Sequence, residues 1–96
     1  MFSVYLLKEA EKELNALPAK IQNRVREQIK SLANFPGVRN CIKIVGYQDT
    51  FRLRVGEYRA LFKVYSDKKV IVVTEIGHRG QDLQKILKSL RRVRRG

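Results

Sequence analysis

Residues 51–79 of the chain read FRLRVGEYRALFKVYSDKKVIVVTEIGHR and predict three consecutive β-strands. In Phe51–Val55 apolar residues alternate with arginines, and successive side chains of a strand point to opposite faces of a sheet. Gly56-Glu57 and the polar residues 66–69 are typical of tight turns between strands. The run Val70–Ile76 is almost entirely apolar, which predicts a central strand buried on both faces. We therefore expect a sheet with one apolar and one cationic face.

Helical patterns flank these strands. The short apolar stretch at residues 2–7 predicts an opening strand, and Lys8–Leu17 is rich in residues that favour helices. Pro18 ends that helix and can begin a second one, which extends to about Asn34 with apolar residues every three or four positions. Residues 81–90 return to helical spacing. The order is an N-terminal strand, a two-helix hairpin, a largely antiparallel twisted sheet of about four to five strands and a C-terminal helix, which is an α+β fold.

A short strand is expected between the helical hairpin and the arginine-bearing strands. Ile42 and Ile44 alternate with Lys43 and Val45, and this period of two is typical of a strand. Residues 46–49 are then typical of a loop.

Charge is the most unusual feature of the composition. The 96 residues fit one domain over 1–96 with a basic tail at about 91–96. Twenty-one Lys and Arg against nine Asp and Glu give a formal net charge of +12. Repulsion of this size disfavours a compact state but attracts polyanions. Nucleic acid is therefore the first candidate partner, a strongly acidic protein the second and an anionic membrane surface a distant third.

Several functional classes are disfavoured by the sequence. A single cysteine, Cys41, excludes an internal disulfide, and no apolar run approaches the roughly 18–20 residues of a membrane span. The N-terminal segment becomes charged too soon for a signal peptide. One histidine without neighbouring cysteines or paired carboxylates cannot supply three or four metal ligands. We expect a cytoplasmic protein without membrane contact, metal or other cofactor.

Four arginines form the candidate site. Arg52 and Arg54 are two residues apart and point the same way, Arg59 follows a glycine turn, and Arg79 ends the last apolar strand. If the strands are neighbours, the four guanidinium groups converge on one surface, where each can bind an oxyanion through two hydrogen bonds. This arrangement suits a phosphodiester better than a neutral ligand.

Structural explanations exist for the same residues. Arg52 and Arg54 also fit the solvated face of an edge strand, where charge prevents aggregation. Arg59 also fits an ion pair with Glu57 or Glu75. The sequence alone leaves these alternatives open.

The segment RLRVGEYRALFKVYSDKKVIVVTEIGHR, with the opening VYLLKEAEKELNALP, resembles the RelE/ParE superfamily of toxins from toxin–antitoxin pairs. Its most specific parts are RLRVG…YR and the IGHR that ends the last strand, and the resemblance covers nearly the whole chain. It implies a short strand, a helical hairpin, a sheet and a closing helix. RelE-like members cut mRNA in the ribosomal decoding site without a metal, by attack of the 2′-hydroxyl on the adjacent phosphorus.

The resemblance assigns catalytic positions to Arg52, Arg54, Arg59 and Arg79. Fixed guanidinium groups stabilise the charge that develops on phosphate oxygens in the transition state, but arginine does not release a proton near neutral pH. Family members often carry a tyrosine about four residues after the motif arginine, and this chain has none beyond Tyr65. Three readings remain: slow cleavage by electrostatics alone, proton transfer by His78, or RNA binding with poor cleavage. His78 also fits an ordinary loop residue.

Further contacts to nucleic acid are expected from Lys43, from Tyr47 and from the basic tail. Tyr47 can stack on an exposed base, although packing is the more common role of such a residue. The tail binds phosphates irrespective of base sequence or is a solvated end. The tail residues in question are Arg91, Arg92, Arg94 and Arg95.

The sequence therefore predicts the toxin of a type II toxin–antitoxin system, a ribosome-dependent endoribonuclease that inhibits translation. The alternatives are a ParE-like inhibitor of DNA gyrase and a catalytically weak RNA-binding module. Under either toxin reading the partner is an acidic, RelB-like antitoxin that neutralises the positive charge. The endoribonuclease reading adds mRNA and the ribosome as partners.

Overall fold

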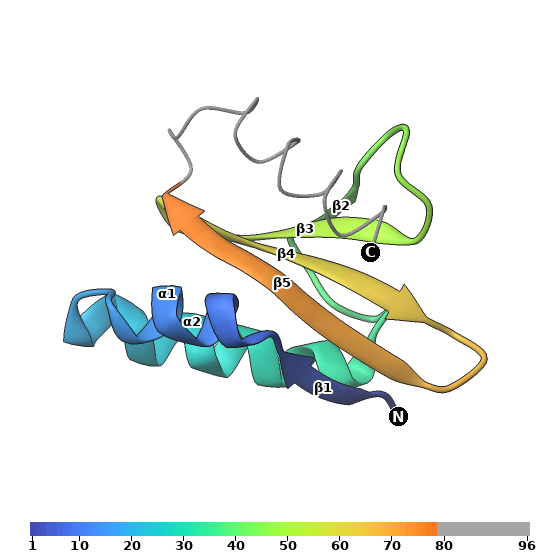
Figure 1. Ribbon diagram of the computed structural model, residues 1–96, viewed down its shortest axis with the longest axis horizontal. Helices are drawn as coiled ribbons and strands as arrows, with labels where there is room; N and C mark the ends of the chain where they lie inside the picture. Colours follow the sequence, from blue (N-terminus) through green and yellow to red (C-terminus); the bar gives the residue numbers. More distant parts are fainter. Residues whose placement is uncertain (79–96) are drawn as a thin grey trace.

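The computed structural model describes residues 1–78, which form a five-stranded sheet with two helices packed on one side (Figure 1). This arrangement confirms the α+β class and the helical hairpin. The predicted helix at 81–90 and the basic tail lie outside the described residues. The elements in chain order are β1 (Ser3–Leu6), α1 (Lys8–Asn15), α2 (Ala19–Ser31), the 3-10 turn η1 (Leu32–Asn34), β2 (Cys41–Lys43), β3 (Thr50–Val55), β4 (Tyr58–Tyr65) and β5 (Val70–His78).

The two helices are amphipathic and bury residues four apart. In α1 these are Ala10 and Leu14, and in α2 they are Val25 and Ile29. The second α-helix is shorter than predicted, because the chain tightens into η1 and the residue before a proline favours an extended backbone. Within residues 1–78, no helix is long and apolar enough to cross a bilayer.

The sheet is mixed, with strand order β1-β5-β4-β3-β2. The edge strand β1 is parallel to β5, and the other three neighbouring pairs are antiparallel. The prediction for 70–76 is confirmed for the interior position, because β5 pairs with β1 and with β4, but the predicted burial of both faces is wrong. The middle strand is β4, and in β5 only the face toward the helices is fully buried, with Ile71, Val73 and Ile76, whereas Val72 on the other face is partly exposed. The helical hairpin covers one face only, so the apolar run reflects β-propensity as well as burial.

The strand predicted around Ile42 is present as β2 and ends at Lys43. Cys41 lies opposite Leu53 and packs against the core, so Ile42 points to the other face beside Arg52 and is 54% exposed. The register of this three-residue edge strand is set by pairing with β3, and a shift of one residue moves every side chain to the other face.

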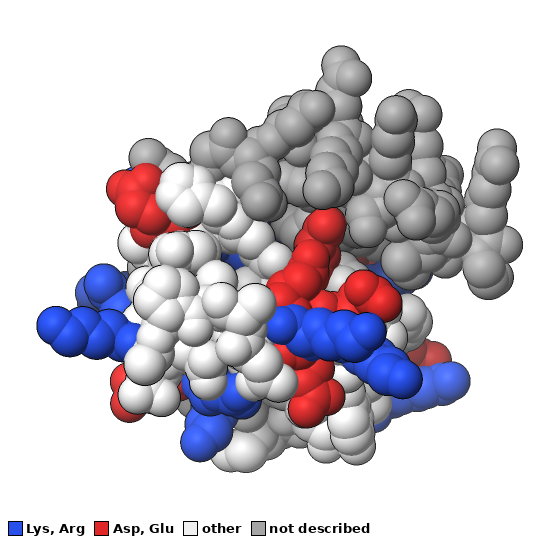
Figure 2. Space-filling model, turned by 60° about the vertical axis from the view of Figure 1, so that its left-hand side comes forward, with Lys and Arg blue, Asp and Glu red and all other residues white. Residues whose placement is uncertain are grey.

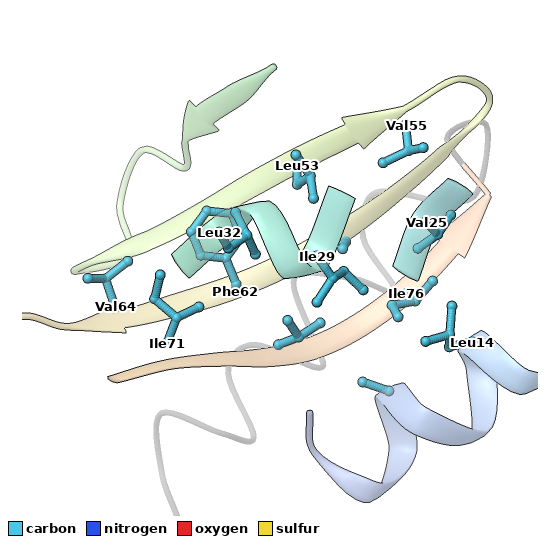
Figure 3. Packing of buried hydrophobic residues seen from close by; sticks show 13 residues of the cluster. Leu14, Val25, Ile29, Leu32, Leu53, Val55, Phe62, Val64, Ile71 and Ile76 are labelled. Atoms are coloured by element: carbon cyan, nitrogen blue, oxygen red, sulfur yellow. The ribbon is translucent and has the colours of Figure 1, made fainter. Parts of the chain in front are cut away.

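The core lies between the helices and the sheet, where Leu14, Val25 and Ile29 meet side chains of β3, β4 and β5 (Figure 3). An aromatic group closes one end of it. The Phe51 and Phe62 rings are stacked with centroids 5.6 Å apart, and Phe35 meets both edge-on.

Three local features shape the sheet around the arginines. Gly56 adopts a φ of 58°, which glycine tolerates best, and allows the tight turn from β3 into β4. A β-bulge lies between Leu61 and Phe62 on β4 and the facing residues of β5. Beyond the end of β1, the carboxylate of Glu13 on α1 accepts a 3.0 Å hydrogen bond from the backbone N–H of Ile76. Where β1 ends, α1 thus supplies a hydrogen-bond acceptor for the backbone of β5.

Candidate nucleic-acid interface

The sheet face opposite the helices carries the arginines of β3 and β4. Arg54 lies opposite Arg59, which in turn lies opposite Gly77. Two residues before Arg54 on β3, Arg52 lies opposite Leu61. Because directly paired residues share a face, the three arginines are neighbours on one surface, as their spacing predicted.

Exposure separates the three arginines. Arg54 is exposed, Arg52 is partly exposed, and Arg59 is only 5% exposed. Burial and the positive charge of Arg52 lower the pKa of the Arg59 guanidinium, whereas the carboxylate of Glu75 acts in the opposite direction. Arg52 and Arg54 are therefore the arginines within reach of a ligand, and Arg59 lies behind them as a fixed charge.

Glu75 is the acidic neighbour of Arg59. It lies opposite Leu61 on β5, on the same face as the arginines and diagonal to Arg59, whereas Glu57 sits in the exposed turn. Of the two ion-pair partners considered from the sequence, the structure favours Glu75. Three cations and one carboxylate leave this face with an excess of positive charge, which suits an anionic ligand.

The charge is distributed unevenly over the molecule. Helix α1 begins with Glu9 and Glu11, and on the side of the molecule shown in Figure 2 acidic and basic side chains lie next to one another. On the paired positions of β3, β4 and β5 that surround Arg52, Arg54 and Arg59 on their face, the one acidic residue is Glu75. Net charge alone therefore does not locate the interface, and the sheet register is needed.

Two residues predicted for the site lie on the opposite face of the sheet. His78 pairs with Tyr58, which packs against the core side, and the two rings meet edge-on with centroids 5.3 Å apart. Lys43 pairs with Phe51, which also faces the core side, although Lys43 itself is exposed at the sheet edge. Both are out of phase with the arginine-bearing positions and so do not lie on the face of the three arginines. A role of His78 or Lys43 in the site stays a prediction.

Tyr47 does border the arginine face. Together with Ile44 it packs against Leu61, which is only 2% exposed although it lies between Arg52 and Glu75. Tyr47 itself is partly exposed. Packing is thus its observed role, and it forms an apolar wall beside the cations.

Comparison with known proteins places the chain in a family. A model of the ParE toxin family of type II toxin–antitoxin systems (parDE) matches residues 4–83. The chain belongs to the RelE/ParE toxin family. It is thus a toxin of the type II toxin–antitoxin class. A search of curated protein sequences gave no significant match.

Solved structures of RelE proteins share the fold. The isolated Escherichia coli RelE toxin superimposes with a TM-score of 0.73 at 17% identity, over 97% of this toxin and 99% of that chain. In the RelE–RelB complex from Pyrococcus horikoshii OT3 the TM-score is 0.69 at 28% identity, over 84% and 98% of the two chains. In the RelBE2 complex from Mycobacterium tuberculosis it is 0.70 at 27% identity, over 81% and 98%.

Five residues predicted for the site of this toxin lie outside the described residues. They are Arg79, Arg91, Arg92, Arg94 and Arg95.

Sequence reasoning did not foresee the part that Gly77, Leu61 and Lys63 play in shaping the face. Gly77 leaves the position beside Arg59 without a side chain, and Leu61 and Lys63 continue the row of Arg59 along β4. Spacing by two residues from Arg59 was the available signal for Leu61 and Lys63. The position of Gly77 depends on pairing between β4 and β5, which no local pattern specifies.

Proposed function

We propose that this toxin is a metal-independent, ribosome-dependent endoribonuclease that cleaves mRNA and so inhibits translation. The observation that carries the proposal is the clustering of Arg52, Arg54 and Arg59 on one sheet face. Arg52 and Arg54 are placed to bind the non-bridging oxygens of a phosphodiester, and Arg59 adds positive potential behind them. As the 2′-hydroxyl attacks the phosphorus and the 5′-oxygen leaves, these charges stabilise the transition state more than the ground state.

Proton transfer is the weaker part of this machinery. Arginine does not titrate near neutral pH, and the single histidine, His78, lies on the other face of the sheet. We therefore assign the rate to orientation and electrostatics, and we expect cleavage to be slower than in an enzyme with a positioned acid–base group, which is worth about 10²–10⁴-fold.

The decisive experiment is cleavage of mRNA on programmed ribosomes, accompanied by mapping of 5′ ends after induced expression in cells. We expect new 5′ ends within coding regions, and we expect Arg54→Ala to reduce the cleavage rate about 10²–10³-fold, as for loss of an oxyanion donor. Lys20→Ala is the matched control, because it removes the same charge from an exposed position on α2, which packs on the opposite side of the sheet. Arrested growth with intact messages would refute the proposal.

A gyrase inhibitor is the second candidate, because the family model that matches the chain is that of ParE toxins. Purified DNA gyrase distinguishes the two functions directly. Inhibition of supercoiling by the toxin, with no cleavage on ribosomes, would establish the ParE-like activity. The third candidate, a catalytically weak RNA-binding module, predicts harmless expression and salt-sensitive RNA binding without new 5′ ends.

The proposed partners are mRNA on the ribosome, in the cytoplasm, and an acidic antitoxin of the RelB type. Two of the similar structures described above are complexes of RelE proteins with RelB antitoxins, and the formal charge of +12 favours an acidic partner. Co-expression with the neighbouring reading frame tests this point. We expect a complex that survives purification and whose association slows as salt is raised.

A further inference from the structure

The arginine face extends beyond the arginines toward the other end of β4. Every second residue of this strand points to this face, in the order Arg59, Leu61, Lys63 and Tyr65. The first two are buried, Lys63 is partly exposed and Tyr65 is 37% exposed. Along β4, the side chains on this face therefore become more exposed to solvent with distance from Arg59.

The open end of the face is aromatic and apolar. Tyr5 on β1 lies beside Val72 on β5, which lies opposite Lys63, and Tyr65 lies opposite Val70. Tyr5 is 58% exposed. The ammonium group of Lys63 lies 5.5 Å from the centroid of the Tyr65 ring, in a cation–π contact. We call this surface the tyrosine platform, made of Tyr5, Lys63, Tyr65, Val70 and Val72.

We propose that the tyrosine platform stacks unpaired nucleobases of the same RNA strand whose phosphates bind to Arg52 and Arg54. This inference rests on the proposed function, because it takes single-stranded RNA as the ligand of the arginine face. It adds a second subsite, one that recognises bases rather than phosphates. Flat aromatic side chains on an open sheet surface, next to cations, are the chemistry with which proteins hold single-stranded nucleic acid.

Sheet geometry gives the subsite its scale. Arg59 and Tyr65 are six positions apart on β4, which is about 20 Å along the strand, a length that a few extended nucleotides span. Tyr5 and Tyr65 are offset by two strands and two residues, which places their Cα atoms about 12 Å apart. The two rings are too far apart to share one base, so each takes a base of its own, above the apolar floor of Val70 and Val72.

Charge favours RNA over a protein as the occupant. The platform is continuous with the arginine face through β4, and its own charged residue, Lys63, is a cation. A strand that leaves Arg52 toward Lys63 keeps its phosphates near positive charge while its bases reach tyrosine rings. An acidic antitoxin shares the charge complementarity but has no comparable need for two separate flat rings.

The test compares two RNA ligands on the full-length toxin. One is a short single-stranded RNA with 2′-O-methyl sugars, which removes the attacking hydroxyl, and the other is an abasic strand with the same number of phosphates. The variants are Tyr5→Leu/Tyr65→Leu, which keeps apolar bulk without rings, and Tyr5→Phe/Tyr65→Phe, which keeps the rings. Arg54→Ala reports on the phosphate site, and circular dichroism verifies that each variant is folded.

We expect the double leucine variant to bind the base-containing strand about ten-fold more weakly for each stacked base, with unchanged binding to the abasic strand. The double phenylalanine variant should bind both strands as the parent does. Arg54→Ala should weaken both strands equally. The chain has no tryptophan, so quenching of tyrosine fluorescence by the base-containing strand, reduced in the leucine variant, gives an independent readout of stacking.

Two results overturn the inference, and they differ from the result that overturns the proposed function. If the folded leucine variant binds the base-containing strand like the parent while Arg54→Ala weakens it, the platform does not hold bases. If the leucine variant loses affinity for the antitoxin and not for RNA, the platform is a protein-docking surface instead. If Arg54→Ala changes the binding of neither strand, the arginine face is not the RNA site and the proposed function itself fails.

Discussion

The charge pair between Arg59 and Glu75 yields the most quantitative prediction. Arg59 is 5% exposed, and its guanidinium is disfavoured by burial and by Arg52 and stabilised by Glu75. Glu75→Gln removes the stabilising charge and keeps the volume. The buried cation then loses its compensation, and the folded state should be less stable.

The size of the loss follows from the sheet register. Arg59 and Glu75 are diagonal neighbours on adjacent strands, so their Cα atoms are about 8 Å apart. Two unit charges at that distance interact by about 2 kcal/mol at an effective dielectric constant of 20. Side chains that reach toward one another raise this value. Removal of one member of a fully buried pair costs about 3–5 kcal/mol, which is an upper bound here because Glu75 is partly exposed. We therefore expect a loss of about 2–4 kcal/mol in the free energy of unfolding for Glu75→Gln.

A double-mutant cycle measured by urea denaturation tests this reasoning. Arg59→Met/Glu75→Gln removes the buried cation together with its partner, so it should recover most of the stability lost in Glu75→Gln. A loss of 2 kcal/mol corresponds to a fall in Tm of about 8–16 °C for a domain of this size. Additive effects, or a change below about 0.5 kcal/mol in Glu75→Gln, would show that Glu75 does not support Arg59.

Three further predictions concern the frame that holds the arginine face. Glu13→Ala removes the acceptor for the Ile76 N–H and should lower the free energy of unfolding by about 1.5–3 kcal/mol. Glu13→Gln keeps an acceptor oxygen and should lower the free energy of unfolding by less. Equal losses for the two variants in chemical denaturation would contradict this role of Glu13. Phe62→Ala removes a fully buried ring and should lower the free energy of unfolding by about 3–5 kcal/mol in the same assay. A loss below about 1 kcal/mol would mean that the surrounding core relaxes to fill the cavity. Burial raises the pKa of the Cys41 thiol, so the folded state keeps the thiol proton at a pH where the unfolded chain has lost it. The contribution of Cys41 to the free energy of unfolding is therefore fully present below the ordinary thiol pKa and is lost as the pH rises through the raised pKa. Cys41→Ala should remove this loss at alkaline pH when the free energy of unfolding is measured against pH. An unchanged slope in that variant would assign the loss to other groups.

Local patterns in the sequence were sufficient for the helices and strands of residues 1–78 and for the common face of Arg52 and Arg54. The alternation in Phe51–Val55 predicted that Arg52 and Arg54 share a face, and the structure shows it. Helix-favouring residues at 8–17 and the spacing of apolar residues at 18–34 predicted the two helices of the hairpin, which cover a single face of the sheet. These features depend on neighbours along the chain, and periods of 2 and 3.6 residues express them directly.

Such local patterns do not predict which strands pair with one another or in which register. The apolar run of β5 predicted an interior strand, which is confirmed, but it predicted neither the parallel partner β1 nor the partial exposure of one face of β5. Likewise Ile42 alternates with Lys43 in a way that fits either phase, and only pairing with β3 places Ile42 on the arginine face and Lys43 on the other. A shift of one residue reverses the two faces, and the sequence of an edge strand with few buried contacts does not resist it.

By itself, the sequence therefore determined the class of the fold, the excess of positive charge and the common direction of Arg52 and Arg54. Only the tertiary structure decided that Glu75 lies beside a buried Arg59, that His78 lies on the opposite face, and that Tyr5 and Tyr65 extend the arginine face. The physical reason is that side-chain direction is set by local backbone geometry, whereas neighbourhood across a sheet is set by register, which is decided by the packing of the whole core.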